Sequence, residues 1–408
     1  MVIKFNSAKH RSFMRFLVSA LIVCVSLENL KVLDIIGAAL KPVHFVMIIA
    51  SAYCFMFKKK HATDIFVGMM FLIIPVFPLT RINDINEWFK SYMIYFIIRV
   101  FMMTALRYVI AEMQLNYSYH LKLLVYIIAF VEVLGIIQFI CMNFFGYFFL
   151  QNFWGSFQFH FNSFGESNGF LRAYSLFHEP SFFALVCNTS LAILLFLNND
   201  LFSTRKKVFL ILLSLISVVC SIAVSGIVIS MVLIVLYLLL KSKRPEKILF
   251  YLIIAFMAFL AIWFFTDLLG PLDRIADELQ TEGTSGYERM VTPFLYVEKV
   301  FEHYPIFGRG LGQEGDVDLI GIIGRYTGIQ NSLIGIVSTF GLSVLFFYIP
   351  AIVYSIRKTK ENRFWLILLV NIIGIYASTG AWCSLDTFLF LVLTVAVGAV
   401  PKHDLKSN

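Results

Sequence analysis

The chain has 408 residues, of which 60% are hydrophobic and only 14% are charged. Soluble domains carry roughly 25% charged residues, so this composition excludes an ordinary soluble domain and indicates a polytopic membrane protein. The formal charge of +8 comes from short basic clusters between apolar segments. Such clusters are typical of an orientation signal and argue against a nucleic-acid-binding surface.

The six cysteines lie mostly inside apolar stretches and show no Cys-x-x-Cys or Cys/His spacing. We interpret them as small buried hydrophobic side chains, and we predict no metal site and no cofactor. The N-terminus is basic and leads into an apolar stretch without a small-residue cleavage pattern. We therefore expect a first span that is retained.

In chain order, apolar stretches approach the ~20 residues that a tilted transmembrane helix needs. Short or interrupted stretches, such as the third with Pro75 and Pro78, leave a count of eleven or thirteen open. The expected fold class is an all-α polytopic membrane protein, with residues 1–408 forming a single integral membrane domain. The pattern predicts about twelve helices, near residues 13–31, 43–57, 62–79, 91–111, 121–146, 181–198, 208–224, 226–240, 248–269, 332–356, 364–382 and 386–400.

The lysines and arginines are unequally divided between the two sides that alternate helices define. One side, which includes both termini, collects roughly twice as many as the other, and the positive-inside rule makes that side cytoplasmic. Two segments on the other side, 147–180 and 270–331, are long, Gly-rich and mixed in charge. We expect them to be large periplasmic loops, and loops of this length are more often functional or disordered than idle.

The first loop ends in RAYSLFHEPSFFALV, residues 172–186, which brings scarce polar residues together directly before an apolar stretch. Glu179 before Pro180 fits a helix start, because proline suits the first helical position and a carboxylate complements the helix dipole. That interpretation assigns no function to Arg172 or His178. A carboxylate at a water-facing membrane mouth, near an arginine, also fits a general base beside an anion-binding group.

In the second loop, Arg274 and Arg289 bracket an acidic stretch. The arginine fork matches phosphate oxygens, whereas pairing with acidic residues of the same loop is the simpler interpretation. The stretch FGRGLGQEG resembles a phosphate cradle but lacks the lysine, the serine and the preceding strand of that motif, which favours a flexible turn. Within the apolar stretches, Arg99 and Glu132 are natural partners for each other, either as a functional pair or as a structural ion pair.

These residues carry a resemblance to a known family. The stretch from Arg172 to Ala184 resembles the signature R-x-x-x-x-F-x-E-P-x-F-F-A, which precedes a central span in O-antigen and exopolysaccharide polymerases of the Wzy type. The stretch from Arg274 to Arg289, with TEGTSGYER and the later YPIFGRGLG, resembles the second periplasmic loop of that family. The two stretches cover about a fifth of the chain, and the span number and loop placement agree over the rest.

The related O-antigen ligases end this loop with a histidine and a polar residue, followed nine residues later by a glycine. Here Gln330 and Asn331 precede Gly341 at that spacing, so glutamine replaces the histidine. Because glutamine cannot accept a proton, the resemblance favours a polymerase over a ligase.

The resemblance implies a fold like that of the multispan GT-C glycosyltransferases that use lipid-linked sugars. It implies transfer of a growing glycan from undecaprenyl pyrophosphate onto a new lipid-linked repeat unit at the periplasmic face of a bacterial inner membrane. Such chemistry needs a base for the attacking hydroxyl and cations for the leaving pyrophosphate. We therefore expect Glu179 and His178 as catalytic residues, and we expect substrate binding by Arg172, Arg274, Arg289, Gln330 and Asn331.

The implied partners are the undecaprenyl-pyrophosphate-linked glycan, a chain-length regulator and a flippase. Two other functions stay open at this stage: an O-antigen ligase and a transporter or flippase of lipid-linked oligosaccharides. A transporter would concentrate polar residues near the bilayer midplane, often in repeated halves. Here the charge gathers in the two external loops, and the sequence shows no repeat.

Overall fold

The computed structural model describes most of the chain up to residue 241 and shorter parts beyond it. The expected spans at 248–269, 364–382 and 386–400 lie outside the described residues, as does most of both long loops. The described residues are 7–27, 30, 32–35, 38–59, 61–74, 76, 85–148, 166–167, 170–177, 179–196, 201–241, 246, 287, 291–311, 331–345, 349, 353 and 357.

The described part of the chain is mostly helical, as the sequence predicts. Each expected span that lies within it contains a helix, because a helix satisfies the backbone hydrogen bonds of a long apolar stretch within the stretch itself. The main helices are α1 (Ser7–Cys24), α2 (Pro42–Phe57), α3 (Ala62–Ile73), α4 (Ile85–Thr104), α5 (Leu106–Leu115), α6 (Tyr117–Phe145), α8 (Pro180–Phe196), α9 (Thr204–Ser221), α10 (Val224–Lys241), α14 (Thr292–His303) and α16 (Ser332–Phe340).

Short elements join these helices. Two antiparallel hairpins, which the sequence pattern did not predict, follow α1 and precede α8. The short elements are the 3-10 turns Val25–Leu27 and Gly341–Val344 and the strands β1 (Leu33–Ile35), β2 (Ala38–Leu40), β3 (Glu166–Ser167) and β4 (Phe170–Leu171).

Helix α6 is long and apolar enough to cross a membrane by itself. Helices α4 and α5 together make a second candidate span within the described residues, if the bend between them lies inside one span. Shorter apolar helices include α2 and α8. The described part of the chain therefore does not test the expected total of about twelve spans.

The expected single span at 91–111 is bent. Helix α4 ends at Thr104, and α5 continues at an angle of 57°. The Thr104 hydroxyl donates to Val100 O, four residues earlier, at 2.7 Å. This competition for a helical carbonyl is a common cause of bending.

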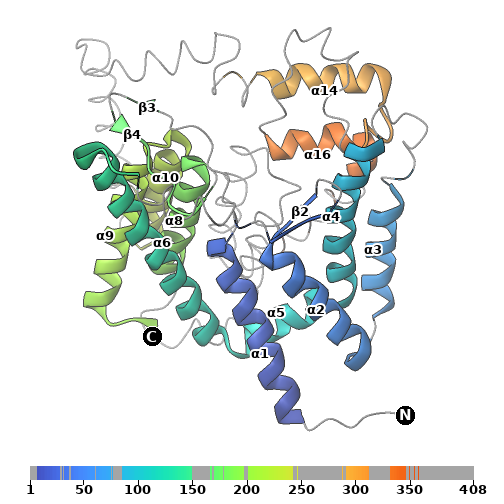
Figure 1. Ribbon diagram of the computed structural model, residues 1–408, viewed down its shortest axis with the longest axis horizontal. Coiled ribbons are helices and arrows are strands. Elements are labelled where there is room, and N and C mark those ends of the chain that lie inside the picture. Colours follow the sequence, from blue (N-terminus) through green and yellow to red (C-terminus); the bar gives the residue numbers. More distant parts are fainter. Residues whose placement is uncertain are drawn as a thin grey trace.

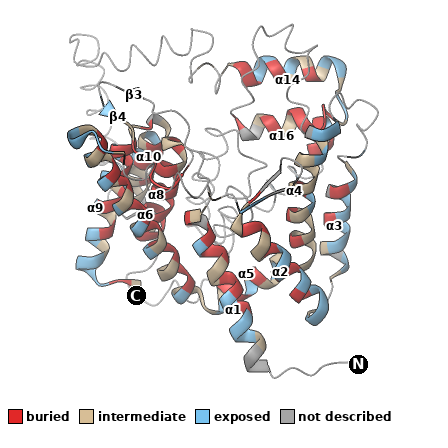
Figure 2. Ribbon diagram, in the orientation of Figure 1, coloured by how far each residue is buried: buried red, intermediate tan, exposed pale blue. Residues whose placement is uncertain are grey.

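Helix α8 forms the centre of one half of the molecule. It packs against α6, α9 and α10, and Figure 2 shows that it is buried along most of its length. Because α8 is apolar on all sides, it needs neighbours on all sides. Helices α2, α3 and α4 form the other half, and α1 lies between the two halves (Figure 1).

Helices α14 and α16 lie across the ends of the others (Figure 1). The chain at α16 and the following turn packs against α4 through a small apolar cluster of Tyr95, Leu311, Phe340 and Val344. The expected span at 332–356 is therefore not one continuous helix, because α16 ends at Phe340 and Gly341 turns the chain.

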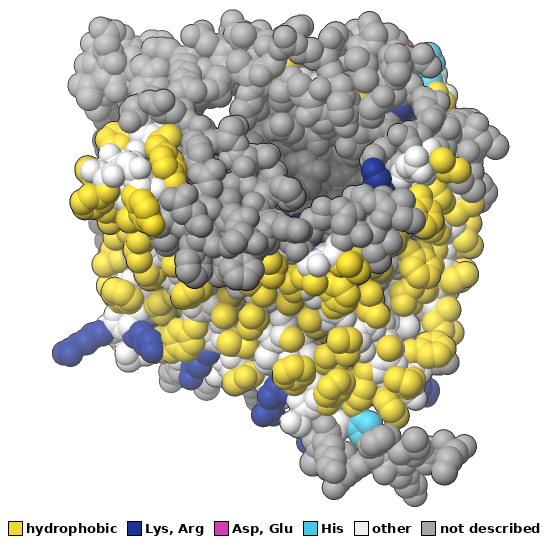
Figure 3. All heavy atoms as spheres, viewed as in Figure 1, with side chains coloured by type: hydrophobic (Ala, Val, Ile, Leu, Met, Phe, Trp, Pro, Cys, Tyr) yellow, Lys and Arg dark blue, Asp and Glu magenta, His cyan; other side chains and the backbone are white. Residues whose placement is uncertain are grey.

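The surface has an apolar side and a basic end. Figure 3 shows hydrophobic side chains over the outer face of the helices, with most of the Lys and Arg at the end where α1 begins and a few toward the opposite end. The start of α1, the end of α2, α5 and the start of α9 all lie toward this basic end (Figure 1). Its exposed basic residues include Arg11, Lys59, Arg107, Arg205 and Lys206.

Candidate functional site

The segment from Leu171 to Phe177 is fixed to helix α6 by hydrogen bonds. Leu171 N donates to Asn143 Oδ1 at 2.7 Å, and Asn143 Nδ2 donates back to Leu171 O at 2.9 Å. Gln138 Oε1 accepts from Tyr174 N at 3.0 Å and from Ser175 N at 2.7 Å. Ser175 has a left-handed φ of 52°, which these bonds hold in place.

The same segment is also attached to the C-terminal end of helix α9. Arg172 Nε donates to Ser221 O at 3.3 Å, and Ala173 N donates to Cys220 O at 3.0 Å. Helix α9 begins at the basic end, so these contacts lie at the opposite end of the bundle (Figure 1). They satisfy carbonyls that a helix end leaves without internal partners.

The residues that follow Arg172 are buried. Ala173, Tyr174, Ser175, Leu176 and Phe177 are all nearly inaccessible, whereas Arg172 is partly exposed. Burial raises the pKa of the Tyr174 phenol to about 12. The phenol therefore stays neutral and is not a candidate base, which leaves the partly exposed charged side chains for chemistry.

Glu179 stands at the start of α8, as the sequence predicts. The helix begins at Pro180, and Glu179 O accepts from Phe183 N at 3.3 Å. Glu179 Oε2 accepts from Ser181 Oγ at 3.1 Å, and the side chain is partly exposed. The helix-start interpretation is confirmed. The carboxylate lies at the end of the bundle where α8 begins, a position that also suits a base.

Of the other expected site residues, Asn331 is the one that the structure describes. It is buried, and its side-chain oxygen accepts from Ile334 N at 3.3 Å, so it caps α16. This is the usual role of asparagine at a helix start. The remaining expected site residues lie outside the described residues: His178, Arg274, Arg289 and Gln330.

The described part of the Gly-rich stretch, residues 307–311, lies in a turn, as the sequence favours. Arg309 N and Gly310 N each donate at 3.0 Å, to Ser338 O and Thr339 O near the end of α16. These two N–H groups are therefore engaged by protein and do not cradle a phosphate. Gly308 and Gly310 have left-handed φ angles of 62° and 96°, which glycine adopts without strain.

Sequence reasoning missed the side chain of Arg309. It is 4% exposed, its Nη1 donates to the Tyr296 hydroxyl on α14, and its guanidinium lies 5.8 Å from the centre of that ring. A buried arginine is rare unless it is paired. In the sequence, a glycine stands on each side of Arg309. The two glycines allow the backbone to pack closely enough to bury the residue between them.

Arg99 and Glu132 are not partners, contrary to the expectation. The Arg99 guanidinium lies 4.4 Å from the Tyr95 ring centre, and its Nη1 is 2.9 Å from Met102 Sδ. Glu132 is fully buried, and its polar neighbours are Ser214 and Cys187, neither of which forms a hydrogen bond of ordinary geometry with its carboxyl oxygens. Ser217 Oγ donates to Glu132 O at 3.3 Å, so this residue faces α9.

Within the part of the chain that the structure describes, no three His, Cys, Asp or Glu side chains gather in a way that would hold a metal ion. Arg172 and Glu179 lie at the end of the bundle opposite the basic end, where Arg172 contacts the end of α9 and Glu179 precedes α8. An arginine can bind an anionic group, and a carboxylate can accept a proton.

Comparison with known families supports the resemblance in the sequence. The family model described as WcaD colanic acid polymerase matches residues 14–400, which covers nearly the whole chain and both long loops. Comparison with curated proteins and with solved structures found no match. The resemblance to exopolysaccharide polymerases is thereby confirmed, and the chain belongs to the WcaD colanic acid polymerase family.

Proposed function

We propose that this protein is an exopolysaccharide polymerase of a bacterial inner membrane, with both termini in the cytoplasm and segments 147–180 and 270–331 in the periplasm. It transfers the growing glycan from undecaprenyl pyrophosphate onto the non-reducing end of a new lipid-linked repeat unit. The family match supports a polysaccharide polymerase with a lipid-linked glycan substrate. The basic end of the helices supports the orientation.

In this reaction a sugar hydroxyl of the new unit attacks the anomeric carbon of the growing glycan. A new C–O bond forms, the bond to the pyrophosphate oxygen breaks, and the lipid pyrophosphate leaves with that electron pair. The proton of the hydroxyl passes to a base, for which we propose Glu179 with His178 as the alternative. Arg172, with Arg274 and Arg289, balances the charge of the leaving group, while Gln330 and Asn331 contribute to sugar binding.

One observation carries this proposal. Arg172 and Glu179 flank a buried segment that Gln138 and the end of α9 hold in place. Their backbone positions are therefore set by α6, α8 and α9, at the end of the bundle away from the basic surface. Such support from neighbouring elements is what a catalytic group needs to keep its geometry.

The test measures polymer length in membranes that contain matched amounts of each variant, supplied with lipid-linked repeat units. Glu179→Gln is expected to lower the rate by ~10²–10⁴, as loss of a positioned base does. Arg172→Lys is expected to lower it roughly 10- to 150-fold, because lysine loses the two-pronged contact with phosphate. Arg205→Lys, which alters the opposite end, serves as the control and should polymerise normally.

If Glu179→Gln polymerises at the normal rate, the glutamate only starts the helix and His178 becomes the candidate base. A flippase would give a different result. Its loss would stop repeat units from reaching the outer face, whereas loss of a polymerase leaves single units there. Detection of single repeat units on the outer face of cells that lack the protein therefore separates the two functions.

A further inference from the structure

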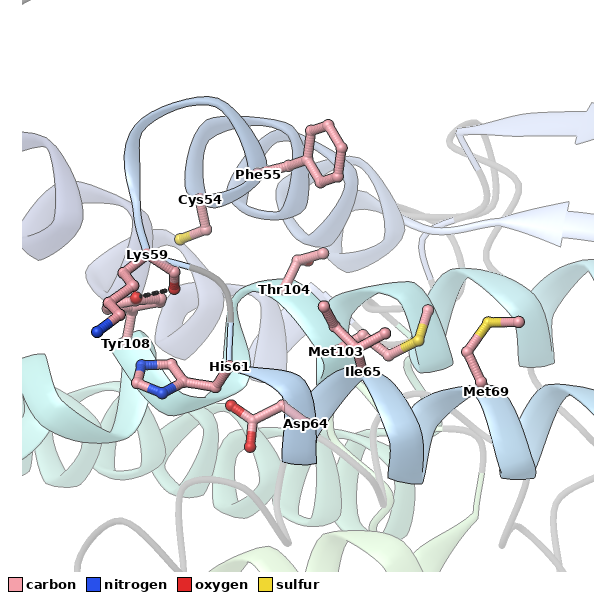
Figure 4. A pocket seen from close by; sticks show the side chains of 10 residues that line it. All are labelled: Cys54, Phe55, Lys59, His61, Asp64, Ile65, Met69, Met103, Thr104 and Tyr108. Atoms are coloured by element: carbon pink, nitrogen blue, oxygen red, sulfur yellow. Dashed lines mark hydrogen bonds between the residues drawn. The ribbon is translucent and has the colours of Figure 1, made fainter. Parts of the chain in front are cut away.

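A cavity of about 160 Å³ opens at the basic end, where α2, α3 and α4–α5 meet. Figure 4 shows its polar side chains, Lys59, His61, Asp64 and Tyr108, gathered at one end. Ile65, Met69 and Met103 extend away from them along the other end. The cavity is therefore amphipathic, and it lies where α2 ends and α3 begins.

An apolar groove continues from this cavity. The groove has a volume of about 370 Å³, runs between α2 and α4, and shares Phe55 and Thr104 with the cavity. Its surface is entirely apolar, and its lining residues Ile48, Phe55 and Phe96 are 45%, 56% and 46% exposed. An open apolar groove on the outer side of a membrane protein faces lipid chains.

The polar end of the cavity is basic, because its acidic side chain is already paired with an arginine. Its acidic lining residue, Asp64, already accepts a bidentate contact from Arg107, at 2.6 Å and 2.7 Å. Lys58 Nζ lies 5.5 Å from the centre of the Tyr108 ring, and the Tyr108 hydroxyl donates to Lys59 O. Lys59 and His61 therefore line the polar end of the cavity, and Lys58 lies beside it near the Tyr108 ring.

We propose that the cavity and the groove together bind one anionic phospholipid of the leaflet at the basic end. The phosphate lies against Lys59 and His61, and one acyl chain follows the groove between α2 and α4. Basic pockets between helices on the cytoplasmic side bind anionic head groups, and each nearby lysine or arginine adds to that attraction. The proposal rests on the membrane orientation of the proposed function.

The same chemistry could come from the lipid-linked substrate, which also joins an anionic group to an apolar chain. The position of the cavity favours a phospholipid, because Arg172 and Glu179 lie at the opposite end of the bundle. A substrate that reacts at that end would carry its pyrophosphate there. The basic cavity faces the other leaflet, where phosphatidylglycerol is a suitable probe.

The test is native mass spectrometry of the full chain, released from nanodiscs of phosphatidylglycerol or of phosphatidylcholine. We expect one tightly held phosphatidylglycerol and no retained phosphatidylcholine. The double variant K59Q/H61Q should lower the occupancy by about five- to tenfold, as loss of one or two basic contacts predicts. Ala52→Trp, which fills the exposed groove, should lower it as well.

Arg205→Gln is the matched control, because it removes one positive charge from the same end but not from the cavity. It should keep the bound phosphatidylglycerol. Equal loss in Arg205→Gln and in K59Q/H61Q would show general attraction to the surface and would overturn the proposal. Displacement by inorganic phosphate alone, or stronger retention of undecaprenyl phosphate, would overturn it too.

A second measurement guards against misfolded variants. Added phosphatidylglycerol should raise the melting temperature of the wild type, because a ligand that binds the folded state stabilises it. It should not raise that of K59Q/H61Q, although this variant should melt at the wild-type temperature in phosphatidylcholine. Neither readout involves polymerisation. A failure of the polymerase proposal, which is tested at Arg172 and Glu179, can therefore be distinguished from a failure of the lipid-binding proposal.

Discussion

Gly308 and Gly341 lie against each other, backbone to backbone. A Cβ atom added to Gly308 would stand 2.5 Å from Gly341 N, and one added to Gly341 would stand 2.4 Å from Gly308 N. Both glycines also have left-handed φ angles, 62° and 59°. The glycine that follows Gln330 and Asn331 at the ligase-like spacing therefore has a packing role in this chain.

Gly341→Ala should destabilise the protein strongly. The added Cβ meets backbone atoms, which cannot move aside as a flexible side chain can, and the backbone conformation of Gly341, with φ 59° and ψ −150°, is essentially restricted to glycine, which costs about 1–3 kcal/mol more. Gly146→Ala is the control, because Gly146 has a φ of 61° but nothing within 4 Å of its added Cβ. The melting temperature in detergent should fall further for Gly341→Ala. Equal losses would mean that backbone conformation alone accounts for the effect.

Gln138→Leu should lower both stability and polymer length. It leaves the N–H groups of Tyr174 and Ser175 buried without an acceptor, and each such group costs about 1–3 kcal/mol. Because the segment that these bonds hold carries Arg172 and Glu179, the activity should fall even in the fraction that stays folded. The measurement is polymer length at matched abundance, with thermal melting alongside. Normal polymerisation would show that the anchoring to α6 does not position the site.

Glu132→Gln should leave stability nearly unchanged. A carboxyl group that is fully buried beside Ser214 and Cys187, without a charged partner among the described residues, stays neutral, so the amide replaces a neutral polar group of similar shape. Thermal melting checks this. If Glu132→Gln instead stops polymerisation in a stable protein, Glu132 takes part in function and α6 carries more than a structural role.

Accessibility to an impermeant thiol reagent tests the orientation. In a chain whose own cysteines are replaced, Ser167→Cys near the start of α8 should react in intact cells. Arg205→Cys at the start of α9 should react only after the inner membrane is opened, because basic loops stay in the cytoplasm. The reverse pattern would place the candidate site on the cytoplasmic face and remove the basis for the proposed reaction.

Up to residue 241 the sequence predicted where the described helices lie, because apolar length depends on local composition, but it did not predict α14, which lies in the segment 270–331 expected to be a loop. It predicted the start of α8 at Pro180 for the same local reason. It did not predict the bend between α4 and α5, which falls at Ala105 within an apolar stretch without glycine or proline. Hydrophobic pattern alone gives no signal for such a bend.

The candidate site was predicted only in part. Arg172 and Glu179 could be identified because charge is scarce in this chain. Their support by Gln138 and by the carbonyls of Cys220 and Ser221 could not be predicted, since those contacts join residues far apart in sequence. The wrong pairing of Arg99 with Glu132 has the same origin. Each residue is an ionisable group in an apolar stretch, for which a charged partner is expected. Helices α4 and α6 pack so that the two side chains contact different neighbours.

The contact of the Gly-rich turn with α16 has a consequence for the chain between them. Arg309 N and Gly310 N donate to Ser338 O and Thr339 O, so the C-terminal end of α16 is fixed to the turn by bonds that do not involve the chain between Leu311 and Asn331. Lengthening a connection costs only about 0.6 kcal/mol for each doubling of its length. Insertions or deletions between Leu311 and Asn331 should therefore leave the contact between α16 and the turn in place.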